Sequence, residues 1–391
     1  MNTGVTETVV TVQEGEQQIR AILVALQSAG TDNEAFERSV RELAGLAEAC
    51  LLDPVSLITQ RLKHPVHATY IGIGKLEELK AECYALSADL VVFDRSLTPV
   101  QIRNLSRILD REVIDRTDLI LRIFSDRART KEARLQVEYA RLSYLLPRLV
   151  GMRENLSRQG GAGGFMSARG AGETQLELDR RKILNRQARL RKELKDVERV
   201  RTTQRTSRLK GSLPRVGLVG YTNAGKSTLM NRLLSMSSGD AKTVFTENML
   251  FATLDTTVRR IDIRGEYLFL LSDTVGFISD LPASLVEAFR STLAEAADSD
   301  LLLEVVDCTD EDREAQSAVT AQTLKEIGAG GLPRIRVMNK ADAEGSLHPA
   351  GFVLRRAPSG GNDEVYISAK TGEGVDVLLS LIMDCLAGMK K

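Results

Sequence analysis

The sequence predicts an α/β protein in three parts: a small N-terminal α/β domain, an antiparallel helical hairpin with coiled-coil-like packing, and a second domain built on a doubly wound, mostly parallel sheet. Short apolar runs alternate with amphipathic runs before residue 117 and again after residue 212, which is typical of strands alternating with helices. Between these regions, leucines recur at seven-residue intervals, as one face of a paired helix requires. A chain of 391 residues is long enough to bury more than one core.

The composition is that of an ordinary globular protein, with 43% apolar and 27% charged residues. No apolar run approaches the roughly 18 residues that a membrane-spanning helix needs, and the N-terminus is polar and acidic rather than signal-like. We therefore expect no transmembrane segment and a cytoplasmic location, with peripheral attachment to a membrane left open. The 4 cysteines are far apart and lack metal-site spacing, which favours reduced thiols over disulfides or a zinc site.

Residues 1–18 are polar and show no periodicity, so we expect a disordered tail there. Residues 19–117 are expected to form the N-terminal α/β domain. Its strands are predicted at residues 21–26, 56–62, 88–93 and 112–114, and its helices at residues 31–49, from 75 onward, and at 99–109. No cluster of catalytic residue types stands out in this domain.

Residues 118–212 are expected to form the helical hairpin. Two apolar stripes predict its two helices: Leu135, Leu142 and Leu149 on the first, and Leu176, Ile183, Leu190 and Val197 on the second. About two dozen Lys and Arg residues stand against about a dozen acidic ones between residues 116 and 210. Such a local excess of positive charge suits a polyanionic partner.

A glycine-rich, basic stretch at residues 151–174 separates the two stripes, and we expect it to be a loop. Loops of this length are usually functional or disordered. Its glycines would let the backbone approach phosphates closely, and Arg153, Arg158 and Arg169 would supply charge. We therefore predict that these arginines contact RNA. The alternative is a flexible linker without a binding role.

The last part, residues 213–391, begins with a phosphate-binding motif. Gly220, Gly225, Lys226 and Ser227 fit the P-loop pattern G-x-x-x-x-G-K-[ST], between an apolar strand and the start of a helix. Glycines let phosphate oxygens approach backbone N–H groups, and the helix N-terminus adds positive potential. The Lys226 amine would bind the β- and γ-phosphates, and the Ser227 hydroxyl would be a ligand of Mg²⁺.

Two later segments suit a switch that senses the γ-phosphate. In residues 251–257, which precede a predicted strand, Thr253 is placed to reach Mg²⁺ and the γ-phosphate. Asp273 and Gly276 follow a second predicted strand at residues 267–272. A P-loop fold needs an acid near the Mg²⁺ shell there, and the Gly276 N–H can meet the γ-phosphate.

Two further segments indicate which base is read. An apolar run leads into Asn339-Lys340-Ala341-Asp342, and another leads into Ser368-Ala369-Lys370. The Asp342 carboxylate can accept two hydrogen bonds from guanine N1–H and N2–H, whereas adenine offers no such pair of donors on that edge. The backbone of residues 368–370 can contact guanine O6. Five motifs in this order predict a Ras-like P-loop GTPase domain that binds and hydrolyses GTP.

The candidate site residues form three groups. The catalytic candidates are Lys226, Thr253 and Gly276, and the candidate Mg²⁺ ligands are Ser227 and Thr253. The candidate GTP-binding residues are Gly220, Tyr221, Thr222, Asn223, Ala224, Gly225, Lys226, Ser227, Thr228, Phe251, Ala252, Thr253, Leu254, Asp255, Asp273, Thr274, Val275, Gly276, Asn339, Lys340, Ala341, Asp342, Ser368, Ala369 and Lys370.

These motifs resemble the HflX family of translational GTPases, and the resemblance extends from about residue 70 to residue 370. It is carried by VIDRT at 113–117, IFSDRA at 123–128, LQVE at 135–138, GETQ at 172–175 and DRR at 179–181, and by Phe277, LP at 281–282, LV at 285–286 and AF at 288–289. The resemblance implies an α/β N-terminal domain, a helical hairpin and a Ras-like domain. It also implies that the chain binds GTP and GDP, associates with the large ribosomal subunit and its rRNA, and splits ribosomes under stress. We further expect a monomer.

Two parts of the chain depart from the HflX family, namely the first 60 residues, which are only loosely similar to it, and the C-terminal end, and one residue departs from the Ras-like pattern. Phe277 stands where Ras-like switches place a water-orienting glutamine, so the water must be oriented by another part of the chain, by K⁺ or by the partner. Asn223 is the candidate K⁺ ligand by resemblance to related GTPases. After Lys370 only one helix is expected, at residues 375–386, where many members of that family carry a further small domain.

Two other functions remain open beside ribosome splitting. One is a nucleotide-gated protein that binds RNA or the ribosome and for which hydrolysis is incidental. The other is a GTPase that acts on a different cellular assembly.

Overall fold

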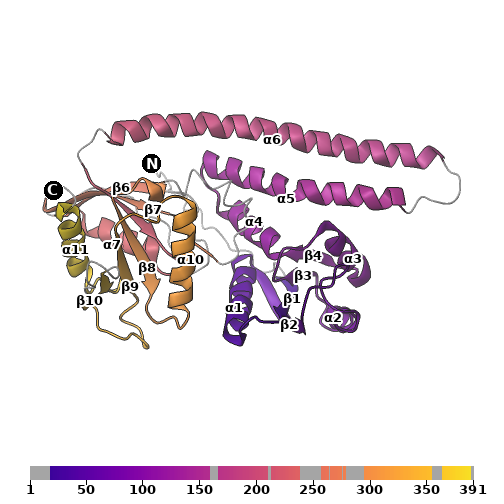
Figure 1. Ribbon diagram of the computed structural model, residues 1–391, viewed down its shortest axis with the longest axis horizontal. Coiled ribbons are helices and arrows are strands. Elements are labelled where there is room, and N and C mark those ends of the chain that lie inside the picture. The colour runs from indigo at the N-terminus through magenta and orange to yellow at the C-terminus, as the bar shows by residue number, and fades with distance from the viewer. Residues whose placement is uncertain are drawn as a thin grey trace, which may run out of the picture.

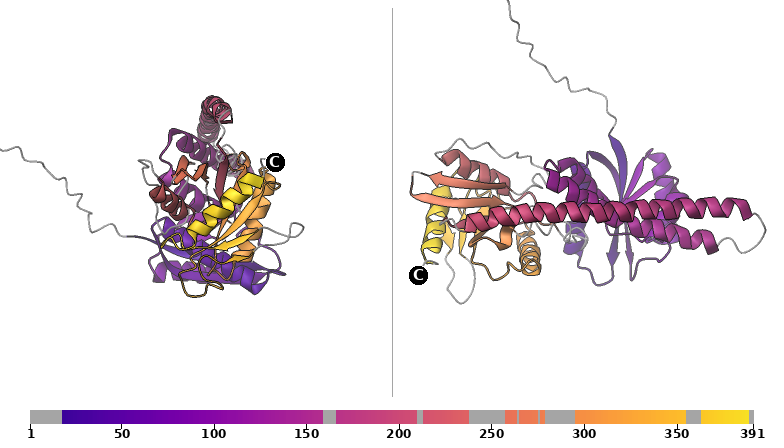
Figure 2. Two further views of the ribbon diagram at one scale, coloured as in Figure 1. Left: turned by 90° about the vertical axis from the view of Figure 1, so that its left-hand side faces the viewer. Right: turned by 90° about the horizontal axis from the view of Figure 1, so that it is seen from above.

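The computed structural model describes residues 18–158, 166–209, 213–237, 257–263, 265–274, 276–278, 295–354 and 363–388. Within the long helices, the side chains of residues 149–158, 166–176 and 201–209 lie outside this description. The chain forms two α/β domains and a pair of long helices, and the longer of these helices lies along both domains (Figures 1 and 2). Of the expected disordered tail, residues 1–17 lie outside the described ranges.

The N-terminal domain is a parallel sheet with helices on both faces. In the described residues its strand order is β2-β1-β3-β4, with the bounds β1 (Ile19–Ser28), β2 (Leu52–Leu62), β3 (Leu90–Phe93) and β4 (Glu112–Asp115). The helices are α1 (Asn33–Ala49), α2 (Ile73–Ala85), α3 (Pro99–Leu109) and α4 (Arg116–Arg127). Alternate residues of β1 point to opposite faces. Ile22 and Val24 belong to the core under α2 and α3, whereas Ala21 and Leu23 belong to the core under α1 and α4.

Local capping fixes two helix starts in this domain. Thr98 precedes α3 and forms a capping box with Gln101, and Pro99 occupies the first helical position, where its missing N–H costs nothing. The start of α3 agrees with the sequence-based prediction for that reason. Asp115 caps α4 by accepting a hydrogen bond from the Asp118 N–H at 3.0 Å, so β4 runs directly into α4.

The hairpin consists of α5 (Lys131–Arg158) and α6 (Met166–Leu209), and the predicted loop is shorter than expected. The sequence predicts a loop over residues 151–174, but α5 continues through Arg158 and α6 begins at Met166. Good helix formers such as Met, Arg, Glu, Leu and Ala are interspersed among the glycines there, and their propensity outweighs the isolated glycines. Arg153, Arg158 and Arg169 therefore lie on helix ends rather than in a long loop.

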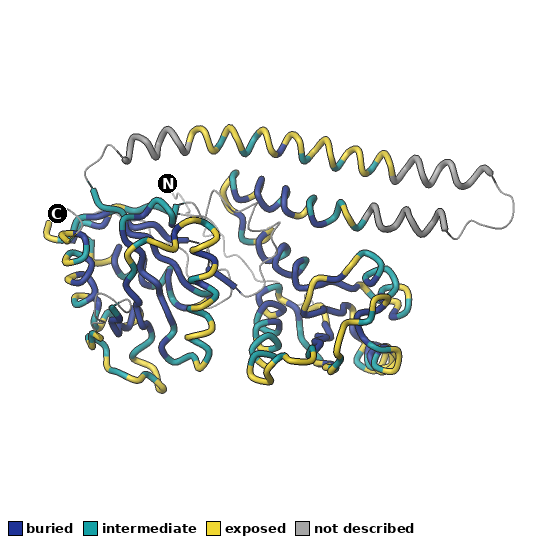
Figure 3. The backbone as a smooth tube through the Cα atoms, viewed as in Figure 1, coloured by how far each residue is buried: buried dark blue, intermediate teal, exposed yellow. Residues whose placement is uncertain are grey.

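The apolar stripes of the two helices meet as predicted. Leu190 of α6 is completely buried, and Leu135 of α5 joins the same cluster. Polar pairs flank the seam: Arg186 donates two hydrogen bonds to Glu138, both at 2.6 Å, and Gln187 donates to the Ser143 hydroxyl at 3.0 Å. The core face of α5 packs on the N-terminal domain, while much of α6 stays exposed (Figure 3).

The second domain is a doubly wound sheet. Its described strands lie in the order β10-β11-β9-β8-β5-β7-β6, with the bounds β5 (Arg215–Val219), β6 (Thr257–Ile263), β7 (Tyr267–Asp273), β8 (Leu301–Asp307), β9 (Arg334–Asn339), β10 (Val353–Leu354) and β11 (Glu364–Tyr366). The β6–β7 and β10–β11 pairs are antiparallel, and the other pairs are parallel. The strand β5 lies between β7 and β8, where the winding direction reverses, and ligands bind at such a switch point in this class of sheet.

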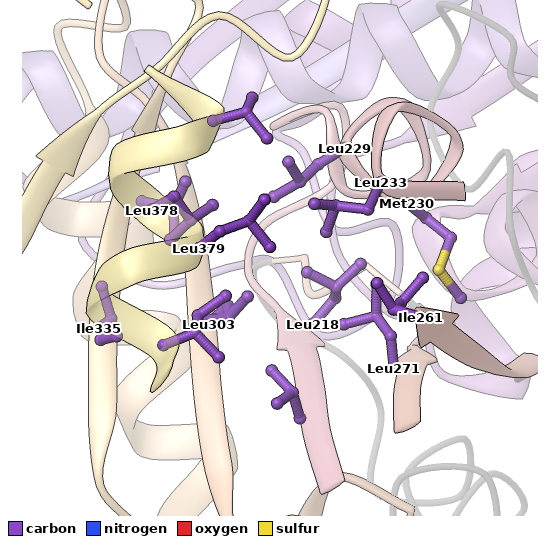
Figure 4. Close-up of a cluster of buried hydrophobic side chains, with 14 of the residues drawn as sticks. Leu218, Leu229, Met230, Leu233, Ile261, Leu271, Leu303, Ile335, Leu378 and Leu379 are labelled. Atoms are coloured by element: carbon purple, nitrogen blue, oxygen red, sulfur yellow. The ribbon is translucent and has the colours of Figure 1, made fainter. Parts of the chain in front are cut away.

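Helices cover both faces of this sheet. The helices α7 (Lys226–Met236) and α11 (Val375–Gly388) pack on one face, and Figure 4 shows Leu229 and Leu233 of α7 with Leu378 and Leu379 of α11 above the strands. Helix α10 (Arg313–Glu326) covers the other face, where Leu324 joins the core. The carboxyl end of β5 is thus held from both sides.

Candidate functional site

The phosphate-binding motif lies at the carboxyl end of β5, where the chain turns into α7. Gly225 has a φ of 96°, and a Cβ built on it would lie 2.2 Å from the Asn339 amide nitrogen. Only glycine fits this position, because the backbone is left-handed and a neighbouring side chain is in direct contact. The loop thereby delivers Lys226 and Ser227 at the first turn of α7, at the positive end of the helix dipole.

Lys226 is buried inside the loop. Its amine donates hydrogen bonds to the carbonyl oxygens of Gly220 at 3.1 Å and Tyr221 at 2.7 Å. Burial lowers the pKa of Lys226 from 10.5 to about 8, and the nearby Asp273 carboxylate opposes this shift. The amine is therefore positioned by backbone carbonyls that a phosphate group can replace.

Ser227 and Asp273 bring two side-chain oxygens together. The Ser227 hydroxyl donates to an Asp273 carboxylate oxygen at 2.9 Å, and Asp273 is completely buried at the end of β7. Next to it, Thr274 donates to the Leu218 carbonyl at 2.6 Å and fixes the loop to β5. A hydroxyl and a carboxylate are hard oxygen donors, so this set fits Mg²⁺. Residues 251–255, which include Thr253, and Val275 lie outside the described residues.

The loop after β7 is tied to the P-loop through its backbone. The Thr222 N–H donates to the Phe277 carbonyl at 2.9 Å, and the Phe277 N–H donates to the Gly220 carbonyl at 3.1 Å. The Phe277 ring is 1% exposed and packs in the core beside Val219. Its side chain is therefore part of the apolar core of the GTPase domain.

Gly276 lies close to the lysine. A Cβ on Gly276 would be 3.0 Å from the Lys226 amine nitrogen and 2.9 Å from Thr222 Cα. The backbone of the expected γ-phosphate sensor thus lies next to the lysine that is expected to bind the phosphates.

The two segments that the sequence predicts to read guanine are joined to the P-loop by one side chain. The Asn339 amide donates to the Ala224 carbonyl at 2.9 Å, and its oxygen accepts from the Ala369 N–H at 2.9 Å. The three loops therefore form one connected surface. Asp342 is exposed at this surface, while Lys340 lies beside it and pairs with Asp307 at 2.6 Å.

One residue of this site was missed by motif reading. Arg232 of α7 donates to the carbonyl of Ala369 at 3.2 Å and also to that of Lys370. It holds the last of the three loops against α7. Its position on the second turn after the P-loop carries no recognisable signal, because the contact joins residues 137 and 138 positions apart.

Comparison with known proteins shows which family this chain belongs to. Three family models match the chain: "GTP-binding GTPase N-terminal" at residues 37–125, "GTP-binding GTPase Middle Region" at 127–208 and "50S ribosome-binding GTPase" at 215–340. A GTPase HflX from Caldanaerobacter subterraneus subsp. tengcongensis is 46% identical over 363 residues, which are 93% of this chain and 79% of that protein. The chain belongs to the HflX family of GTPases.

Two other HflX proteins agree with this assignment. The GTPase HflX of Spirochaeta thermophila is 45% identical, and the match covers 94% of this chain and 86% of that protein. The GTPase HflX of Escherichia coli K12 is 41% identical, and the match covers 89% of this chain and 79% of that protein. A solved GTP-binding protein from the archaeon Sulfolobus solfataricus, in complex with GDP, aligns with 94% of this chain and 99% of its own at 24% identity and a TM-score of 0.47. As an HflX family member, the chain binds GTP and is a GTP hydrolase.

No helix within the described ranges is long and apolar enough to cross a membrane.

Proposed function

We propose that this HflX family member uses its GTP cycle to control attachment to the large ribosomal subunit, and that it splits or rescues ribosomes under stress. The observation that carries the proposal is the match of residues 215–340 to a family described as 50S ribosome-binding GTPases. The hairpin supports it, because α6 is a basic helix of 44 residues that extends along both domains (Figure 1).

In this proposal the P-loop holds the phosphates. The Lys226 amine exchanges its two carbonyl partners for β- and γ-phosphate oxygens, and the Gly276 N–H donates to the γ-phosphate. Ser227 and Thr253 are the proposed ligands of Mg²⁺, with the Asp273 carboxylate beside Ser227. When bound, Mg²⁺ supplies positive charge that offsets the charge on the phosphates. Asp342 selects guanine, and the backbone of Ser368, Ala369 and Lys370 borders the base.

No water-positioning side chain is identified among the residues that the structure describes around this site. The side chain at the usual glutamine position, Phe277, is packed in the core. We therefore expect the isolated protein to turn over slowly, below about 1 s⁻¹, and to be accelerated by its partner. K⁺ held by Asn223 is the proposed second source of acceleration. Asn223 is exposed at the P-loop with a left-handed φ of 60°.

The hairpin supplies the proposed RNA contact. Arg153 and Arg158 lie at the end of α5, and Arg169 lies at the beginning of α6. Arginines fixed on helix ends lose less conformational freedom on binding than arginines in a long loop. The tip of the hairpin is thus proposed to bind large-subunit rRNA, with the helices behind it acting against contacts between the subunits.

The test is GTP turnover with and without purified ribosomal subunits, paired with sedimentation of intact ribosomes. We expect the large subunit to raise turnover, the small subunit to have little effect, and GTP to promote separation of ribosomes into subunits. Fast hydrolysis that ribosomes do not change would contradict the proposal. Splitting supported equally by a non-hydrolysable analogue would favour the clamp with incidental hydrolysis, and no binding to either subunit would favour a different assembly.

A further inference from the structure

A residue of the P-loop reaches out of the nucleotide site into the N-terminal domain. The Tyr221 carbonyl accepts a hydrogen bond from the Lys226 amine at 2.7 Å. The hydroxyl of the same residue donates to Glu42 on α1, the helix at the side of the N-terminal domain that faces the GTPase domain (Figure 1). Tyr221 therefore contacts the phosphate-binding lysine with its backbone and the neighbouring domain with its side chain.

Glu42 passes this contact to the start of α4. Its second carboxylate oxygen lies 2.5 Å from the Arg116 guanidinium, and the two side chains are only 12% and 3% exposed. Water screens such a buried ion pair poorly, and breaking it leaves an uncompensated charge. The positions of Glu42 and Arg116 are thus strongly tied to each other.

The residue before Arg116 continues the connection into the hairpin. Asp115 is completely buried and accepts hydrogen bonds from the Tyr144 hydroxyl at 2.8 Å and from the Arg148 guanidinium at 2.7 Å. It also accepts from the Leu97 N–H at 2.9 Å. Tyr144 and Arg148 lie on α5. A continuous set of polar contacts therefore runs from Lys226 through Tyr221, Glu42 and the adjacent pair at 115 and 116 to the hairpin.

An apolar contact runs parallel to this polar one. Ile278, which follows Phe277, is 1% exposed and belongs to the core cluster that includes residues of α1, α4, α5 and α6. Tyr221 packs against the same cluster. The loop that carries Gly276 is thus anchored in the core shared by the N-terminal domain and the hairpin.

Nucleotide binding can act on Tyr221 and Ile278 through Gly276. A Cβ on Gly276 would lie 3.0 Å from the Lys226 amine, so a γ-phosphate that accepts hydrogen bonds from both the lysine and the Gly276 N–H binds where these two groups are already close. Phe277 is hydrogen-bonded to the P-loop on both sides of Tyr221, so a movement of the loop that carries Gly276 is passed to Tyr221 and Ile278 together. GDP has no γ-phosphate to place between Lys226 and Gly276, so GTP and GDP interact differently with these two residues.

We infer that Tyr221 and Glu42 are positioning residues that couple the γ-phosphate to the hairpin helix α5, through Arg116 and Asp115. The inference deepens the proposed function and rests on it only for the identity of what the hairpin binds. By linkage, the coupling acts in both directions. A partner that shifts α5 therefore changes how the P-loop holds GTP.

The test measures amide hydrogen exchange in α5 at residues 139–148, in the full-length chain and without ribosomes. The protein is loaded with GDP or with a non-hydrolysable GTP analogue. In the parent protein we expect exchange in this segment to differ between the two nucleotides. Glu42→Gln should reduce that difference at least about threefold. The matched control is Glu37→Gln, the same change at an exposed position of α1, which should keep it.

A reciprocal measurement separates coupling from simple loss of stability. Tyr144→Phe removes one hydroxyl on α5, far from the phosphates in sequence, and should change the ratio of GTP-analogue to GDP affinity at least about threefold. A change that only weakened the fold would lower both affinities alike. The inference is overturned by an exchange pattern in α5 that ignores the nucleotide, by a full nucleotide response in Glu42→Gln, or by an unchanged affinity ratio in Tyr144→Phe. None of these outcomes depends on ribosome binding, so they leave the proposed function to its own test.

Discussion

At the scale of single residues, Asp342 is proposed to select guanine. Replacing Asp342 with Asn puts an amide donor against the guanine N–H groups, so we expect GTP affinity to fall by about 2–4 kcal/mol. Xanthosine triphosphate has a carbonyl where guanine has its amino group, and it should bind the variant better than GTP does. Competition binding with GTP, ATP and the xanthosine nucleotide is the measurement. Equal affinity of the parent protein for ATP and GTP would contradict the proposal that Asp342 selects guanine.

The pKa of Lys226 predicts how folding stability and nucleotide affinity depend on pH. Because burial lowers this pKa to about 8, the charged amine costs folding free energy below pH 8, and that cost is relieved as the pH rises towards the ordinary value of 10.5. Phosphate binding has the opposite sign, since it needs the ammonium form. We expect GDP affinity to weaken between pH 7 and 9, by no more than about tenfold per pH unit. Calorimetry in buffers of different ionisation enthalpy should show proton uptake on binding above pH 8, and its absence would contradict the assignment.

The places of the candidate nucleotide-binding side chains in the fold could be predicted from the sequence because the motifs that carry them are local. Lys226 and Ser227 follow directly from the loop that positions them, and Asn339 follows from the strand before it. The contacts of Tyr221 with Glu42 and of Arg232 with the loop after β11 join distant parts of the chain. They depend on how the domains and helices pack, which no local pattern records.

At the scale of elements, the hairpin seam is held by apolar burial. Leu190 is completely buried in the seam, whereas Leu184, on the same helix, is 40% exposed. We expect Leu190→Ala to lower the free energy of unfolding by about 2–4 kcal/mol. Leu184→Ala should change it by less than about 1 kcal/mol. Denaturant unfolding of both variants is the check, and equal losses would mean that the seam is packed differently.

The ends of the hairpin carry the proposed RNA contact. Replacing Arg153, Arg158 and Arg169 together with Gln should weaken binding to the large subunit and lessen its salt dependence, since each phosphate contact releases counterions. Affinity for GTP should stay the same, because these arginines lie on α5 and α6 and not in the GTPase domain. The matched control is a Gln replacement at Arg180, Arg189 and Arg199, which lie further along α6. If the first replacement left subunit binding unchanged, the tip of the hairpin would be a linker without a binding role.

In the hairpin, heptad periodicity predicts the buried helix faces correctly, whereas glycine-rich composition predicts too long a loop. The heptad spacing of Leu135 and Leu190 correctly indicates the buried faces, because burial follows helical geometry. The glycine-rich stretch suggests a loop over residues 151–174, yet the helices continue to Arg158 and begin again at Met166. The good helix formers between the glycines outweigh the low propensity of the single glycines.

At the scale of the whole molecule, a small polar interface joins α1 to the GTPase domain. Arg38 and Arg41 pair with Asp312 at 3.2 and 2.9 Å, and Arg41 is 60% exposed. Exposed pairs contribute little to stability, so Asp312→Asn should change the free energy of unfolding by less than about 1 kcal/mol. It should nevertheless broaden the distance distribution between spin labels on α1 and α10, as should high salt in the parent protein. A distribution that neither change affects would mean that other contacts alone set the arrangement.

The length of α6 makes it a lever arm. At a rise of 1.5 Å per residue, its 44 residues span about 66 Å. A tilt of about 5° at the end that leads into β5 would move the far end by about 6 Å, a distance comparable to one turn of helix. Rearrangements around a phosphate group are small. If they tilt α6, a stiff rod of this length turns them into displacements on the scale of a molecular contact.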